Sequence, residues 1–350
     1  MPALIQDHLK MGCAGILAMP NTKPPVAKVF AADPLPCWSI EEYLAQLLSV
    51  GGEAFENMIV PLYLTQDTTP AMIEAGAKSG ILKACKYYPP HGTTGSEHGR
   101  PFTTFIDNGV FAAMEATGVV LCVHGEEHGL PGEDYFSRST NAEELFYRER
   151  MPRAADKFSK LKIVCEHVTT KVAADFVAKA GDNIAASVTP QHLIYTVGHL
   201  VQGLKYHLFC MPLVKFADDR DALRAAVISS GNRKFFAGTD SAPHAKKVTP
   251  CGCAAGCYTG GIAPQLYAEA FEMAGADFNA TATQEAFKNF LCFNGPAFYG
   301  FAPSKETFTL TKTEQKVGKL KTPAGDIVPL PLGMKSDDAE GPVTMAWSIA

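Results

Sequence analysis

Short apolar runs alternate with longer polar or amphipathic stretches along most of the 350-residue chain. The apolar runs are rich in Val, Ile, Leu, Phe and Ala, which is typical of parallel strands buried on both faces. Alternating strands and helices predict an α/β fold around a parallel sheet. We expect strands at Gly15–Met19, Met58–Leu64, Ile81–Tyr88, Val119–His124, Lys162–Val168, Asn183–Thr189, His207–Cys210 and Lys234–Asp240.

Helices are expected between these strands. The pairs Thr69-Pro70 and Thr169-Thr170 have the composition of helix starts, with a hydroxyl at the cap or a proline just inside it. The expected helices cover Pro70–Ser79, Phe102–Thr117, Ala142–Lys160, Thr170–Ala180 and Arg220–Ser230.

The sheet is expected to close into a (β/α)8 TIM-type barrel. No Gly-x-Gly-x-x-Gly follows an early strand and no Gly-x4-Gly-Lys-Ser/Thr occurs, so a nucleotide-binding open sheet is disfavoured. Without internal repeats or a linker, residues 1–350 are predicted to form one domain. The Pro-, Gly- and Lys-rich tail from about Ser304 is predicted to be irregular.

Composition excludes several classes of protein. A formal net charge of -5 gives no basic footprint for nucleic acid. No apolar run reaches the roughly 20 residues of a membrane helix, and the N-terminus lacks the pattern of a signal peptide. Ten cysteines are too few for a disulfide scaffold, and Cys85, Cys122 and Cys165 are predicted to be buried thiols. We therefore expect a cytoplasmic protein without nucleic-acid or membrane partners.

Four ionisable side chains lie at or near the ends of four apolar runs: Lys86, His124, His167 and Asp240. In a parallel barrel the C-terminal strand ends converge on the face where active sites are built. Two imidazoles, a carboxylate and an amine form a nitrogen and oxygen set that suits zinc. Each residue alone also has a structural interpretation, since a histidine at a strand end is commonly hydrogen-bonded and an aspartate can cap a helix.

Lys86 is unusual in this set because an ammonium group cannot bind a cation. Burial favours the neutral, nucleophilic amine. Such an amine can react with carbon dioxide to form a carbamate, which could bridge two metal ions. The alternative is an ion-paired lysine whose ammonium reaches solvent, as we expect for Lys83.

Several segments, in order from about Gly15 to Tyr299, resemble the shorter, stand-alone dihydroorotases of the metal-dependent amidohydrolase superfamily. These segments are Met19-Pro-Asn-Thr-Lys-Pro-Pro, Lys86-Tyr-Tyr-Pro, Val123-His-Gly-Glu, Glu166-His-Val-Thr-Thr-Lys, Thr189-Pro-Gln-His, Gly238-Thr-Asp-Ser-Ala-Pro-His, Cys251-Gly-Cys and Asn294-Gly-Pro-Ala-Phe-Tyr-Gly.

The resemblance implies a role for each strand-end residue. Lys86 would be a carboxylated lysine that bridges two zinc ions, His124 and His167 would bind one zinc ion, and Asp240 would bind the other and move the proton. The remaining matches concern substrate: Asn21 and His244 for its carboxylate, the backbone of Met211 and Ala254 for the pyrimidine ring, and Thr93 and Thr94 for the tip of a mobile lid loop.

The implied reaction is the reversible interconversion of N-carbamoyl-L-aspartate and (S)-dihydroorotate in de novo pyrimidine biosynthesis. A hydroxide between the two zinc ions would attack the ring amide, with Asp240 as general base and then general acid. The resemblance also implies a small-molecule substrate and a homodimer.

The sequence departs from the family at one point. The His-x-His-x-Arg motif of the family's first strand is absent, and His8, within the first expected helix, does not replace it. We therefore expect that the barrel's first strand is missing from this chain, that the true start lies upstream of Met1, and that one zinc site keeps only Asp240 and the bridge. One zinc ion instead of two, and impaired activity, are the corresponding expectations for the chain as written.

Three alternatives remain open. One is a related cyclic amidase, such as an allantoinase or hydantoinase. Another is a catalytically impaired scaffold that binds a pathway enzyme or a second copy of itself. The third reads Cys251, Cys253 and Cys257 as a structural zinc knuckle, with His244 as the nearest fourth ligand.

Overall fold

The computed structural model describes residues 1–250, 252–334 and 342–350. They form two compact units, each built from more than one stretch of the chain. The N-terminal unit consists of Gly15–Glu166 and Asp175–Ala186. The C-terminal unit consists of Met1–Ala14, His167–Ala174 and Ser187–Ala350.

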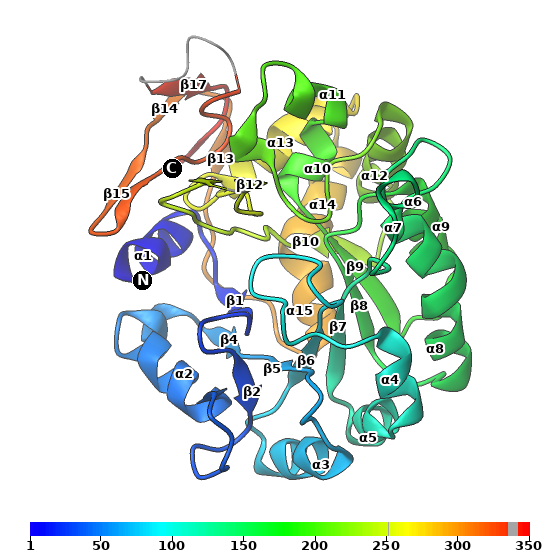
Figure 1. The fold of residues 1–350 in the computed structure, drawn as a ribbon. Helices are drawn as coiled ribbons and strands as arrows, with labels where there is room; N and C mark the ends of the chain where they lie inside the picture. Colours follow the sequence, from blue (N-terminus) through cyan, green and yellow to red (C-terminus); the bar gives the residue numbers. More distant parts are fainter. Residues whose placement is uncertain (251, 335–341) are drawn as a thin grey trace. The chain divides into compact units, whose positions relative to one another are not determined.

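A parallel sheet forms the centre of the N-terminal unit. Its strands follow one another in chain order from β5 to β9, and Figure 1 shows β6, β7 and β8 side by side. The register pairs Lys86 with Cys122 and His124 with Glu166. Every residue of β6, β7 and β8 is buried, as the apolar runs predict. The strands are β5 (Leu62–Tyr63), β6 (Ala84–Tyr87), β7 (Val120–His124), β8 (Ile163–Glu166) and β9 (Ile184–Val188), of which the last two residues are assigned to the C-terminal unit.

The helices between these strands confirm the predicted β-α order. The Thr69 hydroxyl accepts a hydrogen bond from the Met72 amide at 3.3 Å and caps α3, and the Thr170 hydroxyl accepts one from the Ala173 amide at 3.1 Å where α9 begins. The helices are α2 (Ile40–Leu48), α3 (Pro70–Ser79), α4 (Phe102–Asp107), α5 (Val110–Thr117), α6 (Gly132–Tyr135), α7 (Ala142–Leu145), α8 (Met151–Lys157) and α9 (Lys171–Lys179), with a 3-10 turn at Gly52–Ala54 and a π turn at Phe146–Arg150.

Two predicted elements are divided in the structure. The helix expected over Phe102–Thr117 breaks at Gly109, whose φ of 86° lies in the left-handed region. The strand expected over Met58–Leu64 breaks at Pro61, which has no N–H to donate to a ladder. It becomes β4 (Asn57–Ile59), paired with β1 (Gly15–Leu17), and then β5. A further short pair joins β2 (Val26–Lys28) to β3 (Trp38–Ser39).

Aromatic side chains fill the space beside β6. The ring of Tyr87 lies 4.9 Å from that of Phe102, and Phe102 lies 4.9 Å from Phe146, centroid to centroid. All three residues are buried. Cys85, Cys122 and Cys165 are wholly buried thiols, as predicted.

The C-terminal unit holds β10 (Phe235–Ala237), whose neighbour Gly238 donates an amide hydrogen bond to the Val188 carbonyl at 3.2 Å. Asp7, near the chain start, accepts a hydrogen bond from the Tyr258 hydroxyl at 2.8 Å. The helices are α1 (Pro2–Lys10), α10 (Pro190–Ile194), α11 (Val197–Val201), α12 (Ala217–Ile228), α13 (Ala263–Met273), α14 (Thr281–Lys288) and α15 (Asn294–Tyr299), with a π turn at Asn289–Phe293. None of the helices formed by the described residues has the length and apolar character needed to span a bilayer.

The strand predicted at His207–Cys210 is wrong. This stretch overlaps a 3-10 turn, η3 (Tyr206–Leu208), and the Phe209 carbonyl accepts hydrogen bonds from the Gly256 amide and the Lys247 ammonium. The apolar side chains are buried by turn packing, which a run of four residues cannot distinguish from a strand.

The predicted irregular tail also differs from the structure. It contains three antiparallel pairs, and Figure 1 shows β14 and β17 side by side. In β17, buried Val343 and Met345 flank exposed Thr344, as in a strand with one face exposed. The pairs are β13 (Leu310–Thr311) with β18 (Ser348–Ile349), β14 (Gln315–Val317) with β17 (Val343–Met345), and β15 (Leu320–Thr322) with β16 (Gly325–Ile327).

Candidate metal and substrate site

Lys86 and His124 lie on neighbouring strands of the N-terminal unit and are both 1% exposed. Tyr88 lies beside both side chains. Its ring centroid is 5.0 Å from the Lys86 Nζ atom and 6.1 Å from the centroid of the His124 ring. The structure therefore places these two strand-end groups around one aromatic ring.

Glu126 ends the Val123-His-Gly-Glu motif but is not among the predicted site residues. Its Oε2 atom lies 2.6 Å from the Nε2 atom of His124, and the two side chains are 4% and 1% exposed. A carboxylate on one ring nitrogen fixes the tautomer of a neutral imidazole and leaves the other nitrogen, Nδ1, with a lone pair. The spacing His-x-Glu after a strand was the only sequence signal for this contact.

Asn21 and the predicted lid loop are in contact within the same unit. The Asn21 side-chain amide donates to the Thr94 carbonyl at 2.9 Å. Ser96 is buried and ties the loop together, because its hydroxyl accepts from the Thr93 amide at 2.9 Å and donates to the Thr93 carbonyl at 2.6 Å. Thr94 at the tip is exposed. The loop is thus internally bonded, and its opening and closing stay a prediction.

His167 and Asp240, in the C-terminal unit, share an unusual backbone. Their φ angles are 40° and 44°, in the left-handed region that residues other than glycine rarely adopt. The His167 amide donates to the Ser187 hydroxyl at 2.8 Å. Gly238, two residues before Asp240, packs on the same serine, since a Cβ atom added there would lie 2.5 Å from the Ser187 Cβ. Such strained positions are concentrated at functional sites.

His244 and Ala254 lie close together in the same unit. The Nε2 atom of His244 is 2.9 Å from the Ala255 carbonyl oxygen. Burial lowers the pKa of His244, and the nearby charge of Lys247 lowers it further, against the opposing effect of the Ala255 hydrogen bond. Met211 is half-buried in the turn that follows η3.

The thiols support no knuckle within the described residues. There, no three His, Cys, Asp or Glu side chains gather closely enough to hold a metal ion, which applies to His124, His167 and Asp240 as well as to the thiols, and Cys251 lies outside that part of the chain. Cys253 donates to the Tyr206 carbonyl at 3.5 Å. Cys257 is wholly buried and hydrogen-bonds to Cys210, which holds the pKa of Cys210 well below its ordinary value. The zinc knuckle therefore stays a prediction without structural support.

His8 and a separate cavity complete the set of candidates. The Nδ1 atom of His8 lies 2.7 Å from the Leu4 carbonyl oxygen of its own helix.

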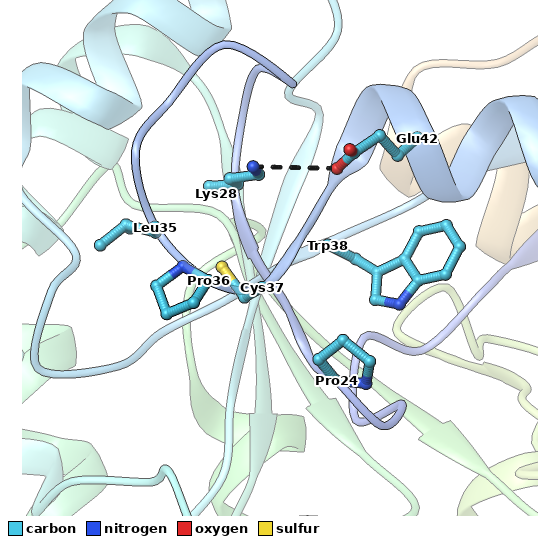
Figure 2. A pocket seen from close by; sticks show the side chains of 7 residues that line it. All are labelled: Pro24, Lys28, Leu35, Pro36, Cys37, Trp38 and Glu42. Atoms are coloured by element: carbon cyan, nitrogen blue, oxygen red, sulfur yellow. Dashed lines mark ion pairs between the residues drawn. The ribbon is translucent and has the colours of Figure 1, made fainter.

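A cavity of about 370 Å³ lies in the N-terminal unit, where Lys28 forms an ion pair with Glu42 at 3.9 Å (Figure 2). None of the predicted site residues lines it. Its lining consists of Pro24, Lys28, Leu35, Pro36, Cys37, Trp38 and Glu42.

Comparison with known proteins places this geometry in context. The chain is 40% identical over 321 residues to a dihydroorotase of Shewanella amazonensis, covering 90% of this chain and 86% of that protein. It is 42% identical over 323 residues to a dihydroorotase of Aromatoleum aromaticum, with the same coverage. A Picosynechococcus dihydroorotase is 38% identical over 343 residues, covering 96% and 91%. No family model matches the chain.

Solved structures agree in fold. A Saccharomyces cerevisiae dihydroorotase in complex with 5-fluoroorotic acid has a TM-score of 0.83 and 26% identity, covering 100% of this chain and 92% of that one. A Campylobacter jejuni dihydroorotase has a TM-score of 0.76 and 25% identity, covering 98% and 91%. A Brevibacillus agri dihydropyrimidinase shares the fold alone, with a TM-score of 0.70 and 12% identity, covering 99% and 76%. The fold class is therefore that of the α/β-barrel amidohydrolases, as the sequence predicts.

Proposed function

This chain belongs to the dihydroorotase family, and we propose that it interconverts (S)-dihydroorotate and N-carbamoyl-L-aspartate in de novo pyrimidine biosynthesis. It is a hydrolase of cyclic amides. The observation that best supports the specific reaction is the identity of 40% and 42% to two dihydroorotases over 90% of this chain.

Zinc is the metal that fits these residues. His124 has one ring nitrogen held by a buried carboxylate, which is the usual environment of a metal-binding histidine. Lys86 is buried among apolar strands, where the neutral amine that reacts with carbon dioxide is favoured. We propose Lys86 (as its carbamate), His124, His167 and Asp240 as ligands. Bound zinc supplies Lewis acidity, which activates water and polarises an amide carbonyl.

The other proposed roles belong to the chain's own side chains. Asp240 accepts a proton from water and delivers it to the ring nitrogen that leaves. The backbone of Asp240 lies in the left-handed region, as at many functional sites. The substrate carboxylate and ring are bound by Asn21, His244 and the backbone of Met211 and Ala254, and the loop with Thr93 and Thr94 excludes water.

Assembly and location are part of the proposal. We propose a cytoplasmic homodimer with a small-molecule substrate and no nucleic-acid or membrane partner. The net charge of -5 supports the absence of a nucleic-acid partner. Sedimentation of the purified protein tests the dimer, and fractionation of cells that express it tests the location.

The decisive experiment compares ring opening of dihydroorotate, allantoin and hydantoin by the zinc-loaded protein. We expect dihydroorotate to be preferred, and Asp240→Asn to lower kcat by about 10²- to 10⁴-fold. Lys86→Met should abolish activity and zinc binding, whereas Lys83→Met, an exposed change on the same segment, should not. Preference for another ring would assign a different cyclic amidase. Binding of dihydroorotate without turnover would favour the scaffold alternative.

A further inference from the structure

Lys247 is a buried lysine that none of the proposed roles includes. Its ammonium donates to the carbonyl oxygens of Phe209 at 2.8 Å, Ala254 at 2.6 Å and Gly256. The residue is 6% exposed. An ammonium group has three N–H donors and a neutral amine has two, so three carbonyl acceptors favour the charged form, against burial, which lowers the pKa of Lys247.

These carbonyls belong to the segments proposed to contact substrate. Ala254 is one of the proposed ring contacts, and its amide also donates to the Lys247 carbonyl at 2.8 Å. Phe209 lies two residues before Met211, the other proposed ring contact. Lys247 therefore connects the turn that ends at Met211 to the hairpin formed by β11 (Val248–Thr249) and β12 (Gly252–Cys253).

The glycine that carries the third carbonyl, Gly256, lies next to His244. A Cβ atom added at Gly256 would lie 2.9 Å from the His244 Nε2 atom, so this glycine backbone packs directly against the imidazole. The positive charge of Lys247 also acts on His244, because it contributes to the lowered pKa of that side chain. Lys247 thus lies close to the residue proposed to bind the substrate carboxylate.

No acidic side chain of the described residues forms an ion pair with Lys247. Three carbonyl dipoles satisfy its donors, and the thiols of Cys210, Cys253 and Cys257 also act on its charge. A buried cation held mainly by carbonyl dipoles attracts an anion that enters the neighbouring site.

We propose that Lys247 is a positioning residue for the substrate carboxylate, an inference that rests on the proposed function. Its ammonium holds the backbone of Phe209, Ala254 and Gly256 in one arrangement and adds positive potential beside His244. The ligand class that this arrangement selects is a pyrimidine ring with a carboxylate, in preference to the same ring without one.

The test uses the zinc-loaded protein and two probes. Binding of 5-fluoroorotate is measured by calorimetry, and hydrolysis of dihydroorotate is compared with that of dihydrouracil, which lacks the carboxylate. The variants are Lys247→Met, which keeps the length but removes the charge and donors, and Lys246→Met, an exposed matched control. Thermal unfolding shows whether each variant is folded.

We expect Lys247→Met to raise the Kd for 5-fluoroorotate and the KM for dihydroorotate by about 10- to 100-fold. The kcat should change by less than about threefold, and the preference for dihydroorotate over dihydrouracil should fall. Lys247→Arg, which keeps the charge, should restore part of the affinity. If Lys247→Met does not fold, Lys247→Gln is held to the same criteria.

Two failures can be distinguished. A wild-type protein that does not bind 5-fluoroorotate contradicts the proposed function, and with it this inference. A wild-type protein that is active, with Lys247→Met matching Lys246→Met in Kd, KM and ring preference, overturns the role of Lys247 alone.

Discussion

The Nε2 atom of His124 and the Oε2 atom of Glu126 lie 2.6 Å apart, although only one residue separates them in the chain. Both side chains are buried, so the pair is protected from competing water. The contact orients the imidazole at the end of β7 and makes Glu126 an indirect partner of the proposed metal ion.

Removing the charge of Glu126 tests this relationship. We expect Glu126→Gln to lower zinc affinity or kcat/KM by about 10- to 100-fold, because an amide is a weaker acceptor for the His124 N–H. Zinc content after titration with a chelator gives the affinity. Glu133→Gln, an exposed substitution nearby in the chain, is the matched control. Equal zinc retention in the two variants would contradict the orienting role.

A second prediction follows from the left-handed backbone of His167. Ser187→Ala removes the acceptor of the His167 amide, which should lower the free energy of unfolding by about 1–3 kcal/mol. Urea denaturation measures the change. Ser49→Ala, at an exposed serine whose hydroxyl only donates, should be close to neutral. A similar small effect in both variants would show that Ser187 does not support this conformation.

Gly95 and Gly118 provide a matched pair for the predicted lid loop. Both have a φ of 74°, but an added Cβ atom meets the Asn21 carbonyl oxygen at 2.6 Å only at Gly95, and nothing within 4 Å at Gly118. Alanine at either position should reduce stability by about 1–2 kcal/mol through the backbone.

Only Gly95→Ala should also weaken substrate binding, because it displaces Asn21, the proposed carboxylate contact. Steady-state kinetics with dihydroorotate should therefore show a raised KM for Gly95→Ala and an unchanged KM for Gly118→Ala. A raised KM in both variants would point to general loss of structure instead.

The lowered pKa of His244 predicts a pH dependence of anion binding. Burial, with the charge of Lys247, holds this pKa below its ordinary value, so the imidazole is neutral above pH 7. If its Nε2–H donates to the Ala255 carbonyl, the Nδ1 atom then carries a lone pair, which repels a carboxylate. Protonation at lower pH puts a hydrogen on Nδ1.

Affinity for 5-fluoroorotate should therefore rise as pH falls from 8 towards 6, by at most about tenfold per pH unit. Calorimetry across this range measures the slope, and His244→Gln should flatten it. Stability should change in the opposite sense. The pKa of His244 is lower in the folded than in the unfolded protein. Its contribution to stability is therefore fully present above the unfolded-state pKa of about 6.5, and it is lost as pH falls through the folded-state pKa.

The parallel strands could be predicted because burial on both faces leaves a continuous apolar run, as in Val120–His124. Strand-end chemistry at Lys86 and His124 followed from the same pattern, because parallel strands place their C-terminal ends on one edge. The N-terminal cap of α3 at Thr69 was predictable because its sequence signal, a threonine directly before Pro70, lies at the helix start itself.

Other features depend on contacts between distant segments. The positive φ angles of His167 and Asp240 could not be predicted from the sequence, because residues other than glycine rarely adopt the left-handed region. Lys247 lies in a polar segment, and its acceptors at Phe209 and Ala254 are set by the packing of a turn and a hairpin. The turn at Tyr206–Leu208 was mistaken for part of a strand for the same reason.

The hydrogen bond between Tyr258 and Asp7 joins residues 251 positions apart in the chain. Every residue of the N-terminal unit lies between Gly15 and Ala186, so that unit can form while the ribosome is still translating the rest. The first fourteen residues belong to the other unit and must wait for partners that are synthesised much later. Closure of such a long loop is slow, and we expect α1 to be among the last elements to dock during biosynthesis.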